Sequence, residues 1–474
     1  MKVLLISIGS RGDLEPFLSL SRELLLRRHH HNHHHQVHLF LQPNWKSLIT
    51  KDLISNSNFH LHFLPFTNGD FYHVTPNNSP PPHSDPRMTH LATLADIIGE
   101  LALPCLEQVK QVAQGCDMLV TCAMARPLIF LLSQLLNIPA MLLHLQPLLP
   151  NRQFPNYRTS SVQFVHAIQN ENLPADNHQE MNNNLEYEES YWKLEHAMEY
   201  HYLKDRLAAA YSSVGCNCPP TWKQLQETLQ GHNPGISIVN GFSNELVPPL
   251  LYNDINSGLG PNVVEVGALA DKYIPSDFCA PPSLERFLLD DEKPIICIGF
   301  GSMPVKHPHE IFKSILILNQ RTVLVGGPLR PPASNQRDLD LQRLRHLVYW
   351  IPSIPYPWLL PKVSLMLCHG GAGVVHACLA AGIPCLVCPL MGDQTAWAGL
   401  LQAKGYGMRC GASRLSELKS QEIVECIQSA QKNAGLIEKC KRLRLNGLKD
   451  EEEQSTGALR LVDFMEKKAE TLLE

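Results

Sequence analysis

Short apolar runs alternate with segments of helical periodicity along most of the chain. Val3–Ile8 has the pattern of a buried strand, and Leu14–Arg28 places Phe17, Leu20 and Leu24 on one face of a helix. This alternation is typical of a parallel sheet whose faces are covered by helices. The same pattern predicts further elements in the first third of the chain: strands at Val37–Leu41, Met118–Cys122 and Ala140–His144, and a helix at Pro127–Leu136.

A second series of the same kind begins near Pro294. Its predicted strands are Ile295–Gly299, Val323–Gly326, Val348–Trp350, Val363–Cys368 and Cys385–Pro389. Because 474 residues exceed what one hydrophobic core usually supports, two domains are expected. We predict an N-terminal domain over residues 1–242, a linker region over 243–293, a C-terminal domain over 294–450 and a terminal helix within 451–474.

Two biased segments interrupt the N-terminal series. Residues 151–190 are polar and rich in Asn, Gln and Pro, which predicts a long surface insertion before a helix at Tyr191–Tyr211. His29–His35 is a run of histidines broken only by Asn32. It is either an adventitious site for a transition metal or a repeat expansion in a solvent-exposed loop. The lack of a neighbouring acidic or cysteine partner favours the loop.

The composition is that of an ordinary globular protein, with 44% apolar and 18% charged residues. Net charge is −5 and the basic residues are scattered, which argues against nucleic acid as a partner. The 14 cysteines fall mainly on predicted elements without zinc-site spacing, so reduced, buried thiols are expected. The opening apolar run is too short for a signal peptide, and no run reaches the roughly 20 residues of a spanning helix. A cytoplasmic protein is therefore expected.

The segment from Val363 to Gly382 carries the most informative chemistry. An apolar strand leads into a glycine-rich turn, His369–Gly373, which opens a helix that ends at Gly382. Backbone N–H groups in such a turn can approach phosphate oxygens, and the helix dipole favours an anion there. His369 can donate a further hydrogen bond to a diphosphate. Alternatively, the glycines only permit close packing of the strand against the helix.

A second polar group follows the next strand. Asp393 and Gln394 come directly after Gly392, and Trp397 lies one helical turn further on. Ligands in open α/β sheets bind at the carboxyl ends of the strands. We therefore expect Asp393 and Gln394 to lie beside the phosphate turn, where a carboxylate and an amide suit sugar hydroxyls.

The ordered motifs from Ile354 to Gly407 resemble the signature region of the UDP-glycosyltransferases, in the branch of sterol glucosyltransferases and bacterial antibiotic glycosyltransferases. The shared residues are Trp358, His369–Gly373, Gly392–Gln394, Trp397 and Ala403–Gly407. The resemblance implies a GT-B-type fold: two Rossmann-like α/β domains with parallel sheets facing a cleft, and a C-terminal helix packed near their junction.

The resemblance also implies a set of donor-binding residues. These are Ile354 and Pro355 beside uracil, His369, Gly371, Ala372, Gly373 and Ser302 at the diphosphate, and Asp393 and Gln394 at the sugar. Ser302 could instead belong to a plain turn at the end of a strand.

Three positions depart from the family pattern. Val374 replaces a hydroxyl residue that bonds a phosphate, a loss worth roughly 1.5–3 kcal/mol of donor binding. Cys368 replaces the first histidine of a pair, and Pro357 replaces a polar residue.

The opening segment Gly9–Pro16 resembles the first motif of the sterol glucosyltransferases, in which the aspartate is the proposed base. The resemblance makes Asp13 the catalytic base and adds Ser10, Arg11 and Gly12 to the donor-binding set. Asp13 follows a predicted strand, where it could accept the proton of an acceptor hydroxyl. The alternative is that Asp13 only caps the following helix, with Pro16 in its first turn.

The implied reaction is transfer of a hexose, with glucose favoured, from a UDP-sugar to a hydroxyl of a sterol or other lipophilic small molecule, with inversion. No metal or cofactor is expected, because a helix N-terminus and His369 would stabilise the leaving UDP. Peripheral contact with a membrane would give access to such an acceptor. The alternative is a non-catalytic homologue that binds a nucleotide-sugar or a lipid. A nicotinamide-dependent oxidoreductase is disfavoured because no G-x-G-x-x-G follows either first strand.

Overall fold

The computed structural model describes residues 1–27, 34–67, 70, 97–148, 203–216, 219–247, 259–269, 273–289, 294–332, 339–390, 392–411, 415–450 and 456–471. The predicted insertion at 151–190 lies outside these residues, as do His29 to His33. The described residues up to Leu269 and from Thr456 onward form one compact unit (unit 1), and those from Tyr273 to Asp450 form another (unit 2).

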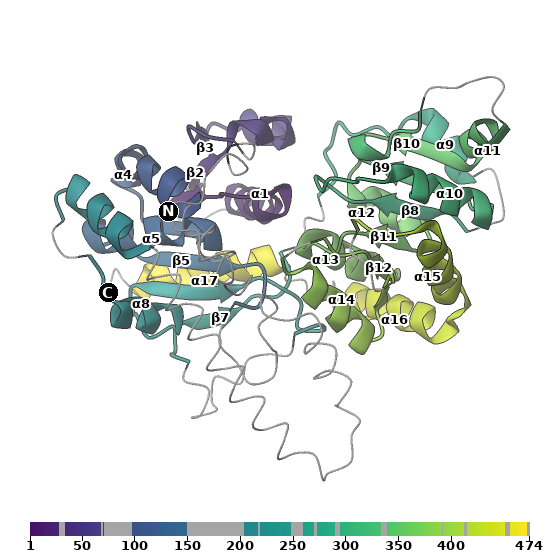
Figure 1. The fold of residues 1–474 in the computed structure, drawn as a ribbon. Coiled ribbons are helices and arrows are strands. Elements are labelled where there is room, and N and C mark those ends of the chain that lie inside the picture. The colour runs from purple at the N-terminus through teal and green to yellow at the C-terminus, as the bar shows by residue number, and fades with distance from the viewer. Residues whose placement is uncertain are drawn as a thin grey trace, which may run out of the picture. The chain divides into compact units, whose positions relative to one another are not determined.

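Unit 1 contains a seven-stranded sheet with the order β3-β2-β1-β4-β5-β6-β7, in which all pairings are parallel (Figure 1). Its strands are β1 (Lys2–Ile6), β2 (Gln36–Leu41), β3 (Phe59–Phe63), β4 (Met118–Cys122), β5 (Ala140–His144), β6 (Ile236–Asn240) and β7 (Val263–Glu265). From β1 the chain adds β2 and β3 on one side of this strand, and it then returns to add β4 to β7 on the other side. The carboxyl ends of β1 and β4 therefore flank the topological switch point, where ligands of open α/β sheets bind.

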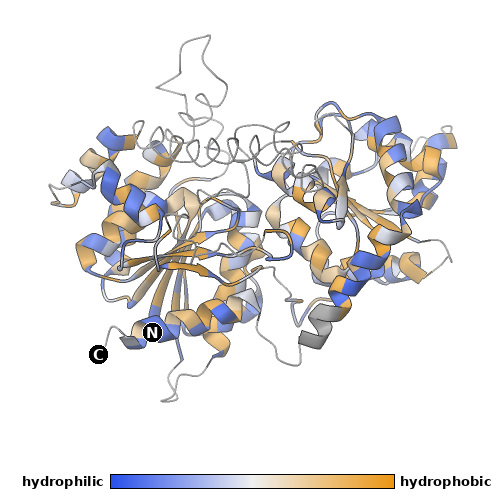
Figure 2. Ribbon diagram, turned by 90° about the horizontal axis from the view of Figure 1, so that it is seen from below, coloured by the Kyte–Doolittle hydropathy of each residue, from blue (hydrophilic) through white to orange (hydrophobic). Residues whose placement is uncertain are grey.

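The helices of unit 1 pack against this sheet. They are α1 (Arg11–Leu26), α2 (Lys51–Ile54), α4 (Leu106–Ala113), α5 (Arg126–Leu136), residues 203–213, α8 (Trp222–Leu229) and α17 (Gly457–Thr471), with shorter 3₁₀ or π turns at Pro43–Leu48, Ile98–Ala102, Leu103–Cys105 and Ala123–Ala125. Strands β4 and β5 are buried along their whole length. In Figure 2 the strands of this sheet are largely hydrophobic, while the outer faces of the helices carry the hydrophilic residues.

Unit 2 contains a six-stranded parallel sheet with the order β10-β9-β8-β11-β12-β13. Its strands are β8 (Ile296–Gly299), β9 (Thr322–Val325), β10 (Val348–Ile351), β11 (Met366–Cys368), β12 (Cys385–Val387) and β13 (Gly407–Arg409). Its helices are α9 (Pro282–Leu289), α10 (Pro308–Leu318), α11 (Leu339–Leu347), α12 (Tyr356–Leu359), α13 (Ala372–Ala381), α14 (Gln394–Ala403), α15 (Ser420–Lys432) and α16 (Ala434–Asp450), with 3₁₀ turns at Gly327–Leu329 and Leu360–Lys362. The predicted fold class, two α/β units with parallel sheets, is confirmed.

Local chemistry explains several helix ends. Gly382 ends α13 in the left-handed conformation at φ +69°, as its sequence context predicted. Asn137 and Asn319 end α5 and α10 in the same conformation, which asparagine tolerates better than most residues do. The described cysteines are unpaired, and all except Cys216 and Cys279 are buried.

The start of α1 differs from the prediction. The helix begins at Arg11 and not at Leu14, because Ser10 is its N-cap and Asp13 completes a capping box from the third helical position. Pro16 consequently lies inside the helix and not in its first turn. The apolar pattern alone missed this polar first turn, since Arg11, Gly12 and Asp13 carry no apolar side chain.

The C-terminal helix α17 belongs to unit 1. Leu461, Val462 and Met465 are fully buried in the core of this unit, and α17 contacts α1. Glu466 on α17 pairs with Arg27 at 3.2 Å and with His35 at 3.0 Å. A segment from the far end of the chain therefore closes the face of the N-terminal sheet.

His35 is not part of a solvent-exposed loop. Its side chain is fully buried and its Nε2 lies 3.0 Å from Glu466 Oε1. The neighbouring His34 is exposed. For the last residue of the histidine run, the loop interpretation is therefore wrong, because α17 covers a position that sequence spacing could not connect with it.

We expect His35→Ala to destabilise unit 1 by about 1–3 kcal/mol, because it removes a fully buried imidazole together with its contact to Glu466. His34→Ala is the matched control and should change the unfolding free energy by less than about 0.5 kcal/mol. Urea unfolding followed by circular dichroism measures both. Equal stability of the two variants would contradict a structural role of His35.

Candidate active site

The glycine-rich turn between β11 and α13 adopts a conformation that requires glycine. Gly370 has φ +84°, and a Cβ atom there would lie 2.3 Å from Cγ1 of Val387 on the neighbouring strand. Gly371 is the N-cap of α13, so Ala372 and Gly373 form its first turn. The backbone N–H groups of this turn have no partners within the helix. Their geometry is that of an anion site at a helix N-terminus.

His369 lies at the base of this turn. Its Nδ1 atom is buried and has no hydrogen-bond partner in the part of the chain that the structure describes. Burial lowers the pKa of His369 to about 4. The imidazole is therefore neutral at pH 7, and it can donate one hydrogen bond to a ligand without carrying a positive charge.

The turn after β8 lies against the same histidine. Gly301 has φ +59°, and a Cβ atom there would lie 3.3 Å from Cε1 of His369. Ser302, the next residue, is exposed. The structure thus brings the predicted Ser302 turn next to the His369 turn, because β8 and β11 are neighbours in the sheet.

Ile354 and Pro355 occupy the segment after β10. Ile354 is buried, and half-buried Pro355 precedes the short helix α12. The hydroxyl of Tyr356, one residue on, would lie 3.1 Å from a Cβ atom at Gly299, the last residue of β8. This segment therefore approaches the same carboxyl edge of the sheet.

Asp393 and Gln394 differ in their availability to a ligand. Asp393 is partly exposed, and its Oδ2 accepts a 2.7 Å hydrogen bond from the indole N–H of Trp397. Gln394 is only 5% exposed: its Oε1 accepts the N–H of Leu390 at 2.7 Å, and its amide nitrogen lies 3.6 Å from the sulfur of Met303. A sugar contact by Gln394 would therefore have to use the remaining hydrogen-bonding capacity of a nearly buried amide, whereas Asp393 already faces partly outward.

Trp397 connects the two polar turns. Its ring is fully buried and packs edge-on against His376, at 5.3 Å between ring centroids. His376 Nδ1 in turn lies 2.7 Å from the carbonyl oxygen of Ala372 in the first turn of α13. The contacts run from Asp393 through Trp397 to the phosphate turn. Sequence reasoning missed His376, because every residue of a helix has a carbonyl group four positions before it and the spacing alone singles out none of them.

In unit 1, Asp13 lies in the turn between β1 and α1. Its Oδ2 accepts the backbone N–H of Ser10 at 2.7 Å and the Ser10 hydroxyl at 2.9 Å. Asp13 therefore does stabilise the start of α1, but from the third helical position and not as the N-cap. Burial raises the pKa of Asp13 above its usual 3.8, and the bonds from Ser10 partly oppose this shift.

Three side chains that sequence reasoning did not identify hold the Asp13 turn. Fully buried Gln42 accepts the N–H of Gly9 at 2.9 Å, and the indole of Trp45 donates to the carbonyl oxygen of Gly9 at 3.1 Å. Cys122, at the end of β4, accepts the N–H of Ile8 at 3.3 Å. All three come from strand-end segments on either side of β1, which only the order of the sheet places together.

The other residues of the opening motif are engaged locally. Arg11 pairs with Glu15 at 2.7 Å, and exposed Gly12 would meet only the Ser10 hydroxyl, at 3.5 Å, if it carried a Cβ atom. Gly9 itself cannot carry a side chain, because its φ is +139° and a Cβ atom would lie 2.4 Å from Asp13 Oδ2.

Solved structures define the class of this fold. The chain superimposes on Phytolacca americana UGT2, complexed with UDP-2-fluoro-glucose and pterostilbene, with a TM-score of 0.62 and 16% identity, covering 98% of each chain. It superimposes on the calicheamicin glycosyltransferase with a TM-score of 0.61 and 16% identity, again covering 98% of each chain. The two parallel sheets are therefore those of the GT-B fold.

Sequence comparisons identify one protein family model and several curated proteins that resemble parts of the chain. Residues 333–454 match the family model "Erythromycin biosynthesis protein CIII-like, C-terminal domain". A sterol 3-beta-glucosyltransferase of Arabidopsis thaliana is 33% identical over 161 residues, which cover 31% of this chain and 22% of that protein. The sterol 3-beta-glucosyltransferase of Debaryomyces hansenii is 29% identical over 212 residues, covering 41% and 13%. Over these segments the chain is similar to the glycosyltransferases that these names describe, and its match spans less than a quarter of these two relatives.

None of the helices that the structure describes is long and apolar enough to cross a membrane.

The neutral state of His369 leads to a pH-dependent stability. Because its folded pKa is about 4 and the unfolded value is about 6.5, the unfolded chain binds more protons between these values. Stability should therefore fall as the pH drops from 7 to 5, with His369 contributing on the order of 1–2 kcal/mol. His369→Gln should lose less stability over this range than the native chain.

His309→Gln is the control for this measurement, because the side chain of His309 is 69% exposed. Urea unfolding at pH 7 and pH 5 compares the two variants. If both lose as much stability on acidification as the native chain does, His369 is not held neutral by burial.

Proposed function

We propose that this chain is an inverting glycosyltransferase that moves a hexose from a UDP-sugar to a hydroxyl group of a lipophilic small molecule. The observation that carries the proposal is the turn from His369 to Gly373. It combines the open N-terminus of α13 with a buried imidazole whose Nδ1 has no hydrogen-bond partner among the described residues. Both features suit a diphosphate.

The electrostatics of the turn suit a leaving UDP. The helix N-terminus contributes partial positive charge, and neutral, buried His369 contributes a hydrogen bond. Ser302 and Asp393 lie on the strand-end turns beside it and are assigned to a phosphate and to the sugar. Glucose as the sugar and a sterol as the acceptor rest on the names of the relatives in Arabidopsis thaliana and Debaryomyces hansenii.

Asp13 is assigned as the general base. In the proposed step its carboxylate takes the proton of the acceptor hydroxyl while that oxygen forms a bond to the anomeric carbon. The bond from this carbon to the β-phosphate oxygen breaks, and the electron pair leaves with UDP. A single displacement inverts the anomeric centre. The raised pKa of Asp13 makes it a better base than an exposed aspartate.

One observation favours the second candidate, a homologue that binds a nucleotide-sugar without transferring the sugar. Val374 is only 7% exposed in the first turn of α13, where the family places a hydroxyl residue. An assay of sugar transfer and of UDP-sugar and TDP-sugar hydrolysis, with a panel of lipophilic alcohols, separates the two candidates. Binding without transfer to any acceptor would favour the second.

Asp13→Asn should lower the transfer rate by roughly 10²–10⁴, which is the usual contribution of a positioned base. The asparagine oxygen can still accept the N–H of Ser10, so the melting temperature and the UDP affinity should be little changed. Glu23→Gln is the matched control, because Glu23 lies on the same helix and burial also raises its pKa. A near-native rate for Asp13→Asn would remove Asp13 from the mechanism.

Trp397→Phe should weaken UDP-glucose binding about threefold to tenfold, because Asp393 loses the indole hydrogen bond that orients it. UDP binding should be unchanged, since Asp393 is assigned to the sugar and not to the nucleotide. Calorimetry with both ligands provides the internal control. An equal loss for UDP and UDP-glucose would show that Trp397 acts on the whole turn.

A further inference from the structure

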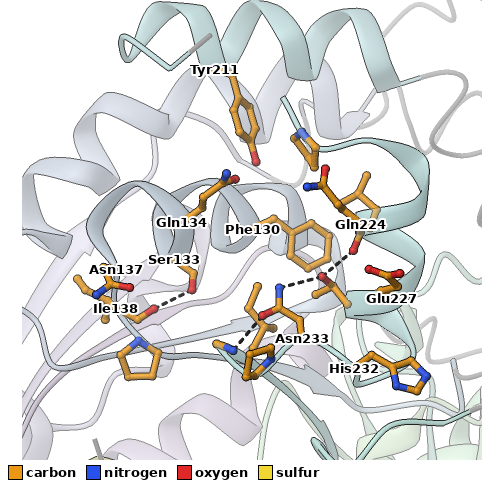
Figure 3. A pocket seen from close by; sticks show the side chains of 17 residues that line it. Phe130, Ser133, Gln134, Asn137, Ile138, Tyr211, Gln224, Glu227, His232 and Asn233 are labelled. Carbon is orange, nitrogen blue, oxygen red and sulfur yellow. Dashed lines mark hydrogen bonds between the residues drawn. The ribbon is translucent and has the colours of Figure 1, made fainter. Parts of the chain in front are cut away.

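Unit 1 contains a cavity at the opposite edge of its sheet from Asp13. The cavity has a volume of about 580 Å³ and lies between α5, the helix at residues 203–213 and α8 (Figure 3). Pro139 and Ile236 line it, and these residues stand where β5 and β6 begin. Asp13 follows the carboxyl end of β1, so the parallel strands separate the two places. A volume of this size is within the range of small-molecule sites.

One buried polar group in the lining of this cavity is without a hydrogen-bond partner among the described residues. Tyr211 is 1% exposed, and its hydroxyl makes no hydrogen bond within the part of the chain that the structure describes. Figure 3 shows this hydroxyl directed toward the side chains of Gln134 on α5 and Gln224 on α8. A buried hydroxyl without a partner is costly to the fold. Its position suits a ligand that supplies the missing hydrogen bond.

The lining indicates the chemistry of that ligand. Tyr211 and buried Phe130 offer aromatic surface, Gln134 offers an amide, and Glu227 offers a carboxylate. Gln224 offers the N–H groups of its amide, because its oxygen already accepts the N–H and the hydroxyl of Thr221. No lysine or arginine is among the described residues that line the cavity, where His232 is the one side chain that can take up a positive charge. Lys223 reaches Glu227 at 3.9 Å from outside the lining. The lining therefore disfavours an anion such as a phosphate. Amides, a carboxylate and a phenol beside aromatic rings suit the hydroxyl groups and the apolar face of a neutral sugar.

We propose that this cavity, defined by Tyr211, Gln134, Gln224, Phe130 and Glu227, binds a neutral saccharide separately from the donor site. The Tyr211 hydroxyl and the two amides bond sugar hydroxyls, and Phe130 contacts the ring. The site does not depend on the proposed transfer reaction, because all its residues lie in unit 1 and none belongs to the Asp13 turn.

Saturation-transfer NMR on the full chain tests the proposal with cellobiose and methyl β-glucoside as probes. Excess UDP is present so that the donor site is occupied. We expect saturable binding of at least one probe in the millimolar range. Glucose and glucose 6-phosphate are compared in the same way, and glucose 6-phosphate should bind at least about threefold more weakly, because Glu227 repels its phosphate. No saturable signal from either probe would overturn the proposal.

Tyr211→Phe should weaken saccharide binding by about threefold to tenfold while leaving the melting temperature equal or higher, since the unpartnered hydroxyl is gone. A merely structural tyrosine would show no change in binding. Tyr349→Phe is the control, because its hydroxyl bonds Ser283 in unit 2. Unchanged binding by Tyr211→Phe would overturn the assignment.

Gln134→Ala provides a second variant at an exposed position, so that loss of folding does not confuse the result. It should also weaken saccharide binding, whereas Gln226→Ala, on α8 outside the lining, should not. Loss of transfer activity in Asp13→Asn with retained saccharide binding would leave this proposal intact. Loss of saccharide binding in Asp13→Asn would instead locate the probes in the catalytic site.

Discussion

The close approach of the His369–Gly373 turn to strand β12 is the constraint on which the candidate donor site depends. Only a glycine at 370 permits this approach, because any side chain would overlap Val387. Once the turn is in contact with β12, α13 starts at the carboxyl edge of the sheet with its N–H groups open. The neighbouring strands then bring Ser302 and Asp393 to the same edge. A substitution at Gly370 would therefore displace several of the residues that are predicted to bind the donor.

In unit 1, the turn between β1 and α1 also depends on a glycine that leaves room for a neighbouring side chain. Gly9 leaves room for the Asp13 carboxylate, and Ser10 donates two hydrogen bonds to it. The same carboxylate thus caps the start of α1, and burial makes it a better proton acceptor. The base and cap interpretations are compatible, since one oxygen atom of Asp13 carries both bonds from Ser10. Gln42 and Trp45 hold the turn from the neighbouring strand-end segment.

Burial has opposite electrostatic consequences at the two sites. It raises the pKa of Asp13, which favours proton transfer to it, and lowers the pKa of His369, which keeps the imidazole neutral. The proposed stabilisation of the leaving group therefore relies on oriented dipoles more than on a formal charge. Buried Trp397 and His376 hold Asp393 and the first turn of α13 in position.

The sequence by itself determined the α/β class, because alternating apolar runs and helical segments have few other arrangements. It also located most of the strands that flank the candidate sites, and it identified Gly382 as a helix end. It missed β3, which alternates with histidines, and β7 and β13, which have only three residues each. It also missed β6, although that strand is buried along its whole length. Only the tertiary structure decided which distant residues meet: Glu466 with His35, Gln42 with Gly9, and Met303 with Gln394. The physical reason is that periodicity reports which face of an element is buried, whereas the partner of each face follows from the order of the strands.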